Sequence, residues 1–105
     1  KSPPVQYRDE EAREMYRRAV ALAPQTATYL AHLAGVLRTL GVPDQALTTW
    51  QRALELQPAV ATWQAEVAEL LWQMERPEES LSHIARASQL QPQDGAYAAR
   101  YVELL

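Results

Sequence analysis

The feature that most constrains this chain is an internal repeat of 34 residues, marked by Pro24, Pro58 and Pro92. When residues 27–58 are laid over residues 61–92, 12 of the 32 positions are identical and no gap is needed. The two segments end in the related sequences RALELQP and RASQLQP, and a weaker match, RAVALAP, ends at Pro24. A period of 20–50 residues is typical of arrays in which each unit buries its apolar face against the next. The sequence therefore predicts two full repeats with a half repeat at each end.

Each repeat reads as two helices joined by a tight turn. Leu33 and Leu37 belong to an apolar stripe with three- and four-residue steps, the period of an amphipathic helix. Gly41 is placed to end this helix, and Pro43 suits the first turn of the next one. Pro58 stops the second helix. We expect helices at residues 8–22, 26–40, 43–56, 60–74, 77–90 and 94–105.

The large and small residues of the repeat resemble the pattern of the tetratricopeptide repeat (TPR) family, whose unit is a 34-residue helix–turn–helix. In the first repeat the matching positions are Leu33, Ala34, Leu37, Gly41, Ala46, Trp50, Ala53, Leu56 and Pro58. In the second repeat they are Val67, Ala68, Leu71, Ile84, Ala87, Leu90 and Pro92. The departures are Leu30 and Gln64 where tryptophan is usual, Glu75 for glycine and Ser80 for alanine. Glu75 matters most for the fold, because the turn between the two helices favours glycine at that position.

The resemblance implies an all-α fold, a right-handed α-solenoid of antiparallel helix pairs with about six helices. It divides the chain into a disordered or linker edge (1–7), the second helix of a partial repeat (8–25), two full repeats (26–59 and 60–93) and the first helix of a further partial repeat (94–105). The chain is accordingly expected to be a fragment of a longer TPR solenoid.

The resemblance also implies a concave groove, lined by the first helices of the repeats, that binds a partner protein or an extended peptide. The implied partner-binding positions are Thr28, Ala31, Gly35, Arg38, Thr39, Thr62, Ala65, Glu69, Trp72 and Gln73, with Ala96, Ala99 and Glu103 in the last half repeat. One TPR subtype grips a C-terminal carboxylate with lysine, arginine and asparagine. Here the matching positions carry Ala31, Gly35, Ala65 and Glu69, so a chaperone-tail clamp is not expected.

Three tryptophans are assigned different roles. Trp72 is the residue of the groove set best suited to a binding hot spot, because tryptophan offers large contact area at low entropic cost. Packing on a neighbouring helix is the alternative for Trp72. Trp50 lies where the repeat has a core aromatic, and Trp63 is expected to pack against the preceding repeat. Arg38 and Glu69 would pair with a partner, pair with groups in their own surroundings, or remain solvated surface charges, and the solvated state is favoured.

The C-terminal segment carries an apolar face formed by Tyr97, Tyr101, Leu104 and Leu105. The ends of repeat arrays normally carry a polar cap, so this face predicts stacking of a following repeat or self-association through the C-terminal helix. A structural spacer or homo-oligomerisation module with no groove ligand is therefore the alternative function. Carbohydrate binding is disfavoured, because one tryptophan without an aromatic row is a thin platform.

The composition argues against several classes of function. A formal net charge of −3 disfavours nucleic-acid binding, and no apolar run is long enough to insert into a membrane. The chain has no cysteine, and His32 and His83 lie on different predicted helices without other ligands at metal-binding spacing. With only three glycines and no phosphate loop or nucleophile motif, we expect no enzyme activity, no metal and no cofactor.

Nine arginines against one lysine, with much alanine, leucine and glutamine, resemble the composition of bacterial proteins from GC-rich genomes. Bacterial envelope proteins, including exopolysaccharide exporters, contain TPR arrays that recruit other machinery in the periplasm. By analogy, the resemblance favours a periplasmic scaffold in a bacterial assembly or polysaccharide secretion system. A cytoplasmic assembly factor is the alternative.

Overall fold

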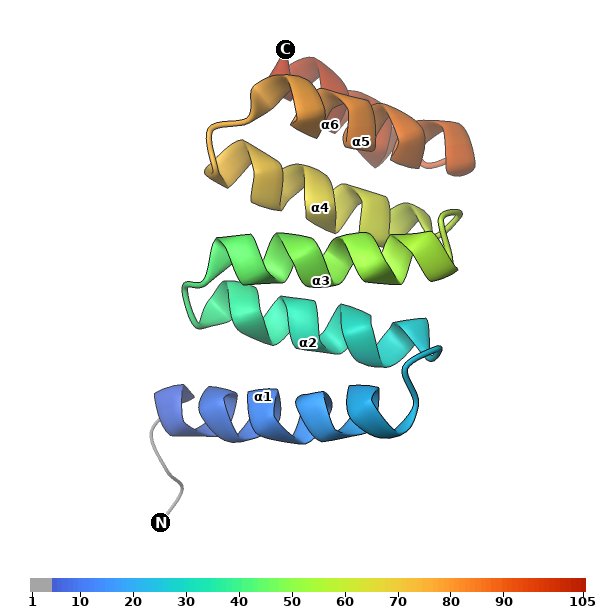
Figure 1. Ribbon diagram of the computed structural model, residues 1–105. Coiled ribbons are helices and arrows are strands. Elements are labelled where there is room, and N and C mark those ends of the chain that lie inside the picture. Colours follow the sequence, from blue (N-terminus) through green and yellow to red (C-terminus); the bar gives the residue numbers. More distant parts are fainter. Residues whose placement is uncertain (1–4) are drawn as a thin grey trace. The chain divides into compact units, whose positions relative to one another are not determined.

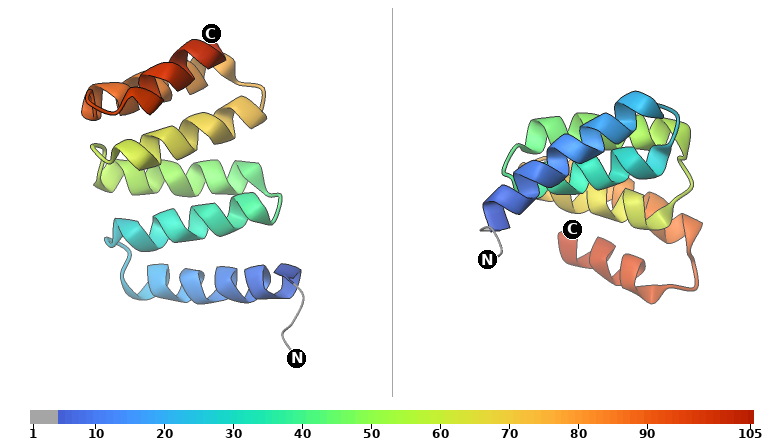
Figure 2. Two further views of the ribbon diagram at one scale, coloured as in Figure 1. Left: turned by 180° about the vertical axis from the view of Figure 1, so that it is seen from behind. Right: turned by 90° about the horizontal axis from the view of Figure 1, so that it is seen from below.

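The computed structural model describes residues 5–105, with side chains from Tyr7 onward, and this part of the chain contains six helices and no strand (Figure 1). The helices are α1 (Val5–Leu22), α2 (Ala27–Thr39), α3 (Pro43–Leu56), α4 (Ala61–Gln73), α5 (Pro77–Leu90) and α6 (Gly95–Leu104). Two compact units divide the chain: unit 1 (Lys1–Leu56) holds α1–α3, and unit 2 (Gln57–Leu105) holds α4–α6. Within each unit, successive helices run in opposite directions (Figures 1 and 2). The predicted all-α fold of helix pairs is confirmed.

The helix ends follow the positions of the prolines in the sequence. α1, α3 and α5 each end two residues before a repeat proline, because proline disfavours helical backbone in the residue that precedes it. From α2 to α6, every observed end lies within one residue of its prediction. The predicted linker at residues 1–7 is wrong at residues 5–7, which are already helical, while residues 1–4 lie outside the described part. Val5 directly follows Pro4, and proline is a signal for a helix start.

Small side chains bring the helices of unit 1 together. Ala34 on α2 and both Ala46 and Ala53 on α3 are completely buried, and α2 packs along α3. Trp50 is only 5% exposed, which confirms its predicted place in the core. An alanine at a helix contact lets the partner backbone approach closely, so a neighbouring tryptophan can fill the remaining space at native packing density. α1 in turn packs on α2.

The turn between α2 and α3 uses the glycine that the repeat pattern predicts. Gly41 has φ +79°, a left-handed conformation that side chains disfavour. Its N–H donates to the Arg38 carbonyl at 3.0 Å, and the Val42 N–H donates to the Leu37 carbonyl at 3.1 Å. This pair of bonds is the Schellman motif, which satisfies the last carbonyls of a helix.

The turn between α4 and α5 has the same geometry without a glycine. Glu75 takes φ +60°, and no other non-glycine residue among those described has a positive φ. Its N–H donates to the Trp72 carbonyl at 3.1 Å, and the Arg76 N–H donates to the Leu71 carbonyl at 2.9 Å. The departure from the family pattern thus leaves the turn intact. Its consequence is energetic, because a left-handed residue with a side chain costs about 1–2 kcal/mol.

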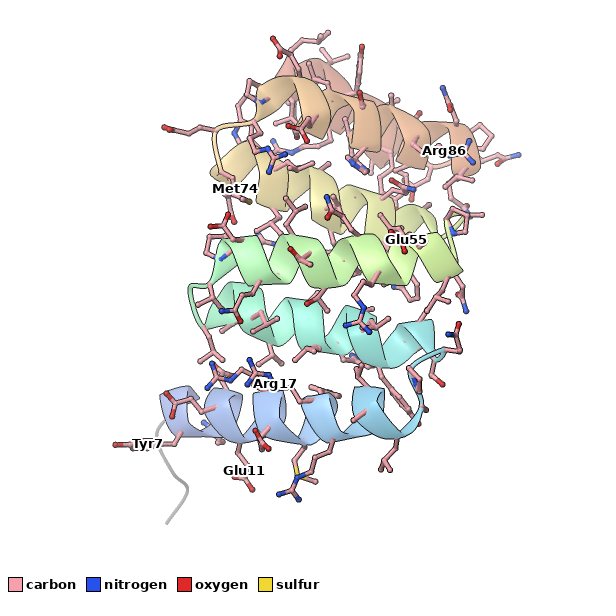
Figure 3. All side chains as sticks on the ribbon, viewed as in Figure 1. Tyr7, Glu11, Arg17, Glu55, Met74 and Arg86 are labelled. Atoms are coloured by element: carbon pink, nitrogen blue, oxygen red, sulfur yellow. The ribbon has the colours of Figure 1, made fainter. Side chains whose placement is uncertain are left out.

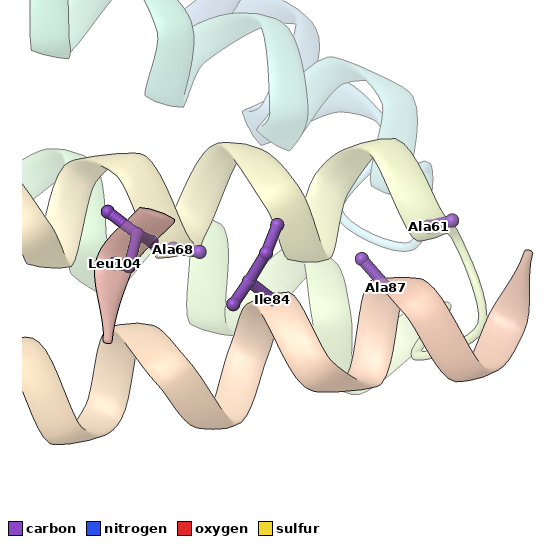
Figure 4. Packing of buried hydrophobic residues seen from close by; sticks show 5 residues of the cluster. All are labelled: Ala61, Ala68, Ile84, Ala87 and Leu104. Atoms are coloured by element: carbon purple, nitrogen blue, oxygen red, sulfur yellow. The ribbon is translucent and has the colours of Figure 1, made fainter. Parts of the chain in front are cut away.

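The core of unit 2 includes a row of buried side chains from all three of its helices (Figure 4). The row consists of Ala61, Ala68, Ile84, Ala87 and Leu104, with Ala65, Leu81, Leu90, Tyr97 and Tyr101 packed against it. Ile84 occupies the repeat position that Trp50 fills in unit 1. A smaller aliphatic residue is compatible with that position because α6 contributes Leu104 to the same core.

The predicted C-terminal stacking face does not form as one exposed surface. Leu104 is only 3% exposed and lies beside Ala68 in the core of its own unit, and Tyr97 and Tyr101 are half-buried against that core (Figure 4). Leu105 is 73% exposed. α6 therefore turns its apolar stripe onto α4 and α5, which gives these side chains partners within unit 2.

The second departure from the family pattern, Ser80, places a hydroxyl inside unit 2. Ser80 is completely buried on α5, and its hydroxyl donates to the Ala68 carbonyl of α4 at 2.6 Å. A buried hydroxyl is tolerated only when it is hydrogen-bonded, and this bond also joins the two helices of the repeat. Serine is nearly as small as the alanine it replaces, so close helix approach is retained.

The third departure, Gln64, forms a partly buried polar chain with His83 and Pro58. The Gln64 amide nitrogen donates to the Pro58 carbonyl at 3.0 Å, so its side-chain oxygen faces His83 Nδ1 at 2.7 Å. His83 Nδ1 must carry the proton in this arrangement, because the Gln64 oxygen can only accept. Burial lowers the pKa of His83, and the nearby Glu79 carboxylate opposes this shift only in part.

We predict that Glu75→Gly stabilises the chain by about 1 kcal/mol, because glycine takes the left-handed conformation without the side-chain penalty. Urea unfolding followed by circular dichroism measures this change. Glu55→Gly is the matched control, because Glu55 lies in the last turn of α3 with helical backbone and its replacement by glycine should not stabilise the chain. A Glu75→Gly variant that is no more stable than the parent would contradict the proposed strain.

We also predict that the free energy of unfolding falls as the pH drops from 7.5 to 5.5. A histidine with a lowered pKa binds protons more readily when unfolded, so acidification favours the unfolded chain, and the loss is complete below the folded-state pKa. His83→Gln keeps a donor toward Gln64 but does not titrate, so its stability should depend less on pH. Urea titrations at several pH values measure the free energy of unfolding of both chains. An equal change of this free energy with pH in variant and parent would refute the prediction.

Candidate functional site

The predicted groove positions of α4 form an accessible face of unit 2. Thr62, Trp72 and Gln73 are exposed, whereas Ala65 and Glu69 are half-buried. Trp72 is 40% exposed at the C-terminal end of α4. We call these five residues the α4 face; their three- and four-residue spacing places them on one side of the helix.

A hollow at the end of the α4 face has a volume of about 540 Å³. Trp72 and Gln73 line it together with Glu75 and Pro77, so the indole forms part of a concavity. The strained turn at Glu75 places these groups together, because it sends the chain directly from the end of α4 into Pro77, the first residue of α5. The volume lies in the range of about 300–1,000 Å³ that is usual for ligand sites.

Glu69 is held by an arginine that sequence reasoning missed. Arg100 on α6 donates through Nε and Nη2 to the two Glu69 carboxylate oxygens at 2.6 and 2.7 Å. Arg100 also lies 3.6 Å from Glu103. The hydrogen bond to Glu69 raises the pKa of Arg100, which is charged at any physiological pH. The expected solvated state of Glu69 is therefore wrong; the only signal in the sequence was opposite charge on two consecutive first helices.

The predicted positions of α2 give a second face, in unit 1. Thr28, Gly35 and Thr39 are exposed and Arg38 is half-buried, but Ala31 is 8% exposed and offers a partner almost no surface. The Thr39 hydroxyl donates to the Gly35 carbonyl at 3.1 Å, so it is engaged by its own helix. Thr28, Gly35, Arg38 and Thr39 are called the α2 face below.

Gly35 has no packing reason to be glycine. A Cβ built at this position would meet no atom within 4 Å, and the residue lies inside a regular helix. Glycine in a helix interior costs about 0.5–1 kcal/mol relative to alanine. The α2 face thus carries a local cost that no contact among the described residues explains.

His32 and Asp94 both have structural partners. His32 stacks on Tyr16 with ring centroids 5.3 Å apart, an interaction that joins α1 to α2. Asp94 caps α6 by accepting a hydrogen bond from the Ala96 N–H at 3.0 Å.

Among residues 5–105, no cluster of three histidine, cysteine or acidic side chains has the arrangement of a metal site. Within the same residues, every helix is too short or too polar to cross a bilayer.

No family model matches the sequence, and no curated protein matches it either. Solved structures do. A thermophilic TPR protein from Thermus thermophilus is 27% identical over 91% of this chain, with a TM-score of 0.84, and the match spans 49% of that protein, about half its length. The type III secretion chaperone SycD of Yersinia enterocolitica, in complex with a peptide of the translocator YopD, is 18% identical over 93% of this chain and 77% of its own (TM-score 0.82).

A third similar structure is the first TPR of Spaghetti bound to an HSP90 peptide. It is 15% identical over 94% of this chain and 79% of its own, with a TM-score of 0.85. These likenesses agree with the 34-residue period and with the helix pairs described above. This chain has the fold and the 34-residue repeat period of tetratricopeptide repeat proteins.

Proposed function

We propose that this chain is a non-catalytic scaffold that binds a partner protein or peptide through the first helices of its repeats. The observation that carries the proposal is Trp72, a 40% exposed indole on the α4 face beside a hollow of about 540 Å³. Trp50, in contrast, is 5% exposed in the core of unit 1. Leaving part of an indole in water forgoes hydrophobic stabilisation, and tryptophan is enriched among the residues that dominate binding energy.

Gly35 supports the same function on the α2 face. With open space around it and a helix-destabilising backbone, the glycine is explained if a partner chain lies close against the helix. On the α4 face, the two hydrogen bonds from Arg100 to Glu69 orient that carboxylate and fix α6 beside α4. A preorganised surface loses less entropy on binding than a mobile one.

Two similar structures hold peptides, an HSP90 peptide on Spaghetti and a YopD peptide on SycD, which supports a peptide-sized ligand here. The bacterial assembly or polysaccharide secretion setting remains a prediction from the sequence. The alternative, a spacer or homo-oligomerisation module, loses part of its basis because Leu104 is buried within its own unit. Light scattering across a dilution series tests the homo-oligomerisation version of this alternative, which requires a stable dimer.

We predict that Trp72→Ala weakens partner binding by about 2 kcal/mol or more, roughly thirtyfold in Kd, because a hot-spot indole is lost. The partner is first captured on the immobilised chain and then titrated in purified form. Tyr29→Ala is the matched control: Tyr29 is 38% exposed but lies outside the α2 face. Circular dichroism should show unchanged helicity in both variants. Equal affinity of Trp72→Ala and the parent would place the partner elsewhere.

For Gly35→Ala we predict opposite effects on folding and binding. The free energy of unfolding should rise by about 0.5–1 kcal/mol, because alanine favours helix and nothing obstructs its methyl group. Affinity for the partner should fall, because that methyl group occupies the surface where the partner chain lies. Gly41→Ala is the control, and its φ of +79° should make that substitution destabilising. Greater stability with unchanged affinity would remove Gly35 from the binding surface.

A further inference from the structure

Unit 1 contains a cleft on the side of α2 away from the α2 face. The cleft has a volume of about 460 Å³ and is lined by residues of α1, α2 and α3. Its α2 residues are Leu33 and Leu37, one turn apart on the same stripe of the helix. Gly35 and Arg38 lie on the opposite stripe, since each residue advances an α-helix by about 100°. The cleft is therefore separate from the α2 face.

The base of the cleft is apolar. Val20, Leu33 and Leu37 contribute to it and are largely buried, so only their edges reach the opening. The neighbouring Thr48 and Thr49 use their hydroxyl hydrogens within α3, donating to carbonyls one turn back at 3.1 and 2.8 Å. Neither threonine has a hydrogen left to donate, so the threonine walls cannot supply an O–H to an incoming ligand.

Two arginines supply the charge of the cleft. Arg17 and Arg52 line it and are exposed, and within residues 5–105 neither guanidinium has an ion pair. On α1 the arginine that pairs with Glu14 is Arg18, at 3.9 Å. Figure 3 shows Arg17 leaving α1 on the side that faces α2. Free guanidinium groups beside an apolar base favour a ligand that carries both a carboxylate and an apolar side chain.

One acidic group also lines the cleft. Asp44 stands at the start of α3, eight residues before Arg52, or about 12 Å along the helix axis. The charges of the lining residues sum to +1, from two arginines and one aspartate, whereas the whole chain has a formal net charge of −3. A span of about 12 Å accommodates roughly four residues of an extended peptide.

We propose that this cleft binds a short acidic segment of a partner protein, with a leucine-like side chain over Leu33 and Leu37 and carboxylates on Arg17 and Arg52. The apolar base distinguishes this occupant from a bare anion, which would gain nothing from it. The two arginines distinguish it from a purely apolar peptide, which would offer no carboxylate to their guanidinium groups. Guanidinium–carboxylate pairs are strong because their geometry allows two parallel hydrogen bonds.

The test uses the ¹⁵N-labelled chain and the probe acetyl-Gly-Glu-Leu-Leu-Glu-Gly-amide in an NMR titration. The peptide should shift the amide signals of α3 around Arg52 and the Nε–H signals of both arginines. A peptide with glutamine in place of both glutamates should bind about tenfold more weakly or worse, because charged hydrogen bonds are lost. Raising the salt concentration should weaken the acidic peptide more than the neutral one.

Matched variants separate the cleft from general electrostatic attraction. Arg17→Gln with Arg52→Gln should weaken the acidic peptide by about tenfold or more, while Arg18→Gln with Arg86→Gln changes the net charge equally and should leave binding intact. The double variant Arg17→Glu, Arg52→Glu should instead prefer a lysine-containing peptide. Trp72→Ala should have no effect, so failure of the α4 face and failure of this cleft are distinguishable.

Four results would overturn the proposal. The first is the absence of any shift at millimolar peptide, and the second is equal weakening in both arginine pairs. The third is a set of shifts confined to α4 or to residues outside unit 1. Binding of inorganic phosphate that resists competition by the peptide would likewise assign the arginines to a different ligand.

Discussion

The structure depends on a steric constraint, the close approach of paired helices, which only small residues permit. Ala34, Ala46 and Ala53 are completely buried in unit 1, and Ala68 and Ala87 are completely buried in unit 2. A larger side chain at any of these points would push the helices apart and expose the apolar stripes beside them. The 34-residue period of the sequence follows, because each helix pair needs its small and large residues at the same places. The spacing of the buried residues also determines which residues of the first helices remain exposed.

The second repeat keeps the constraint but replaces apolar contacts with hydrogen bonds. Ser80 bonds to a carbonyl of α4, and Gln64 links His83 to the Pro58 carbonyl. Each polar group is satisfied, and no buried side-chain nitrogen or oxygen without a partner is found among the described residues. Such bonds are directional, so they specify how α4 and α5 meet more narrowly than apolar contacts would. Arg100 and Glu69 add a similar link between α6 and α4.

The sequence was sufficient for the helices, apart from the start of α1, and for the core position of Trp50, because both follow from local rules that repeat. It was insufficient where the outcome depends on contacts between helices. The burial of Leu104 requires α6 to fold back onto α4 and α5, and the pairing of Glu69 requires Arg100, which is distant in sequence. Glu75 shows a third kind of limit. The pattern marked it as a departure, but only the backbone shows that the turn forms and carries strain.

The proposed scaffold function requires that a partner contacts Trp72 on the α4 face. The indole N–H signals of Trp50, Trp63 and Trp72 report on it directly, because each gives one resonance in a ¹⁵N-labelled chain and their environments differ. Adding the captured partner should shift or broaden the Trp72 signal and leave that of Trp50, buried in the core of unit 1, in place. A partner that binds with the Trp72 signal unmoved would contradict the claim and leave the α4 face without a ligand.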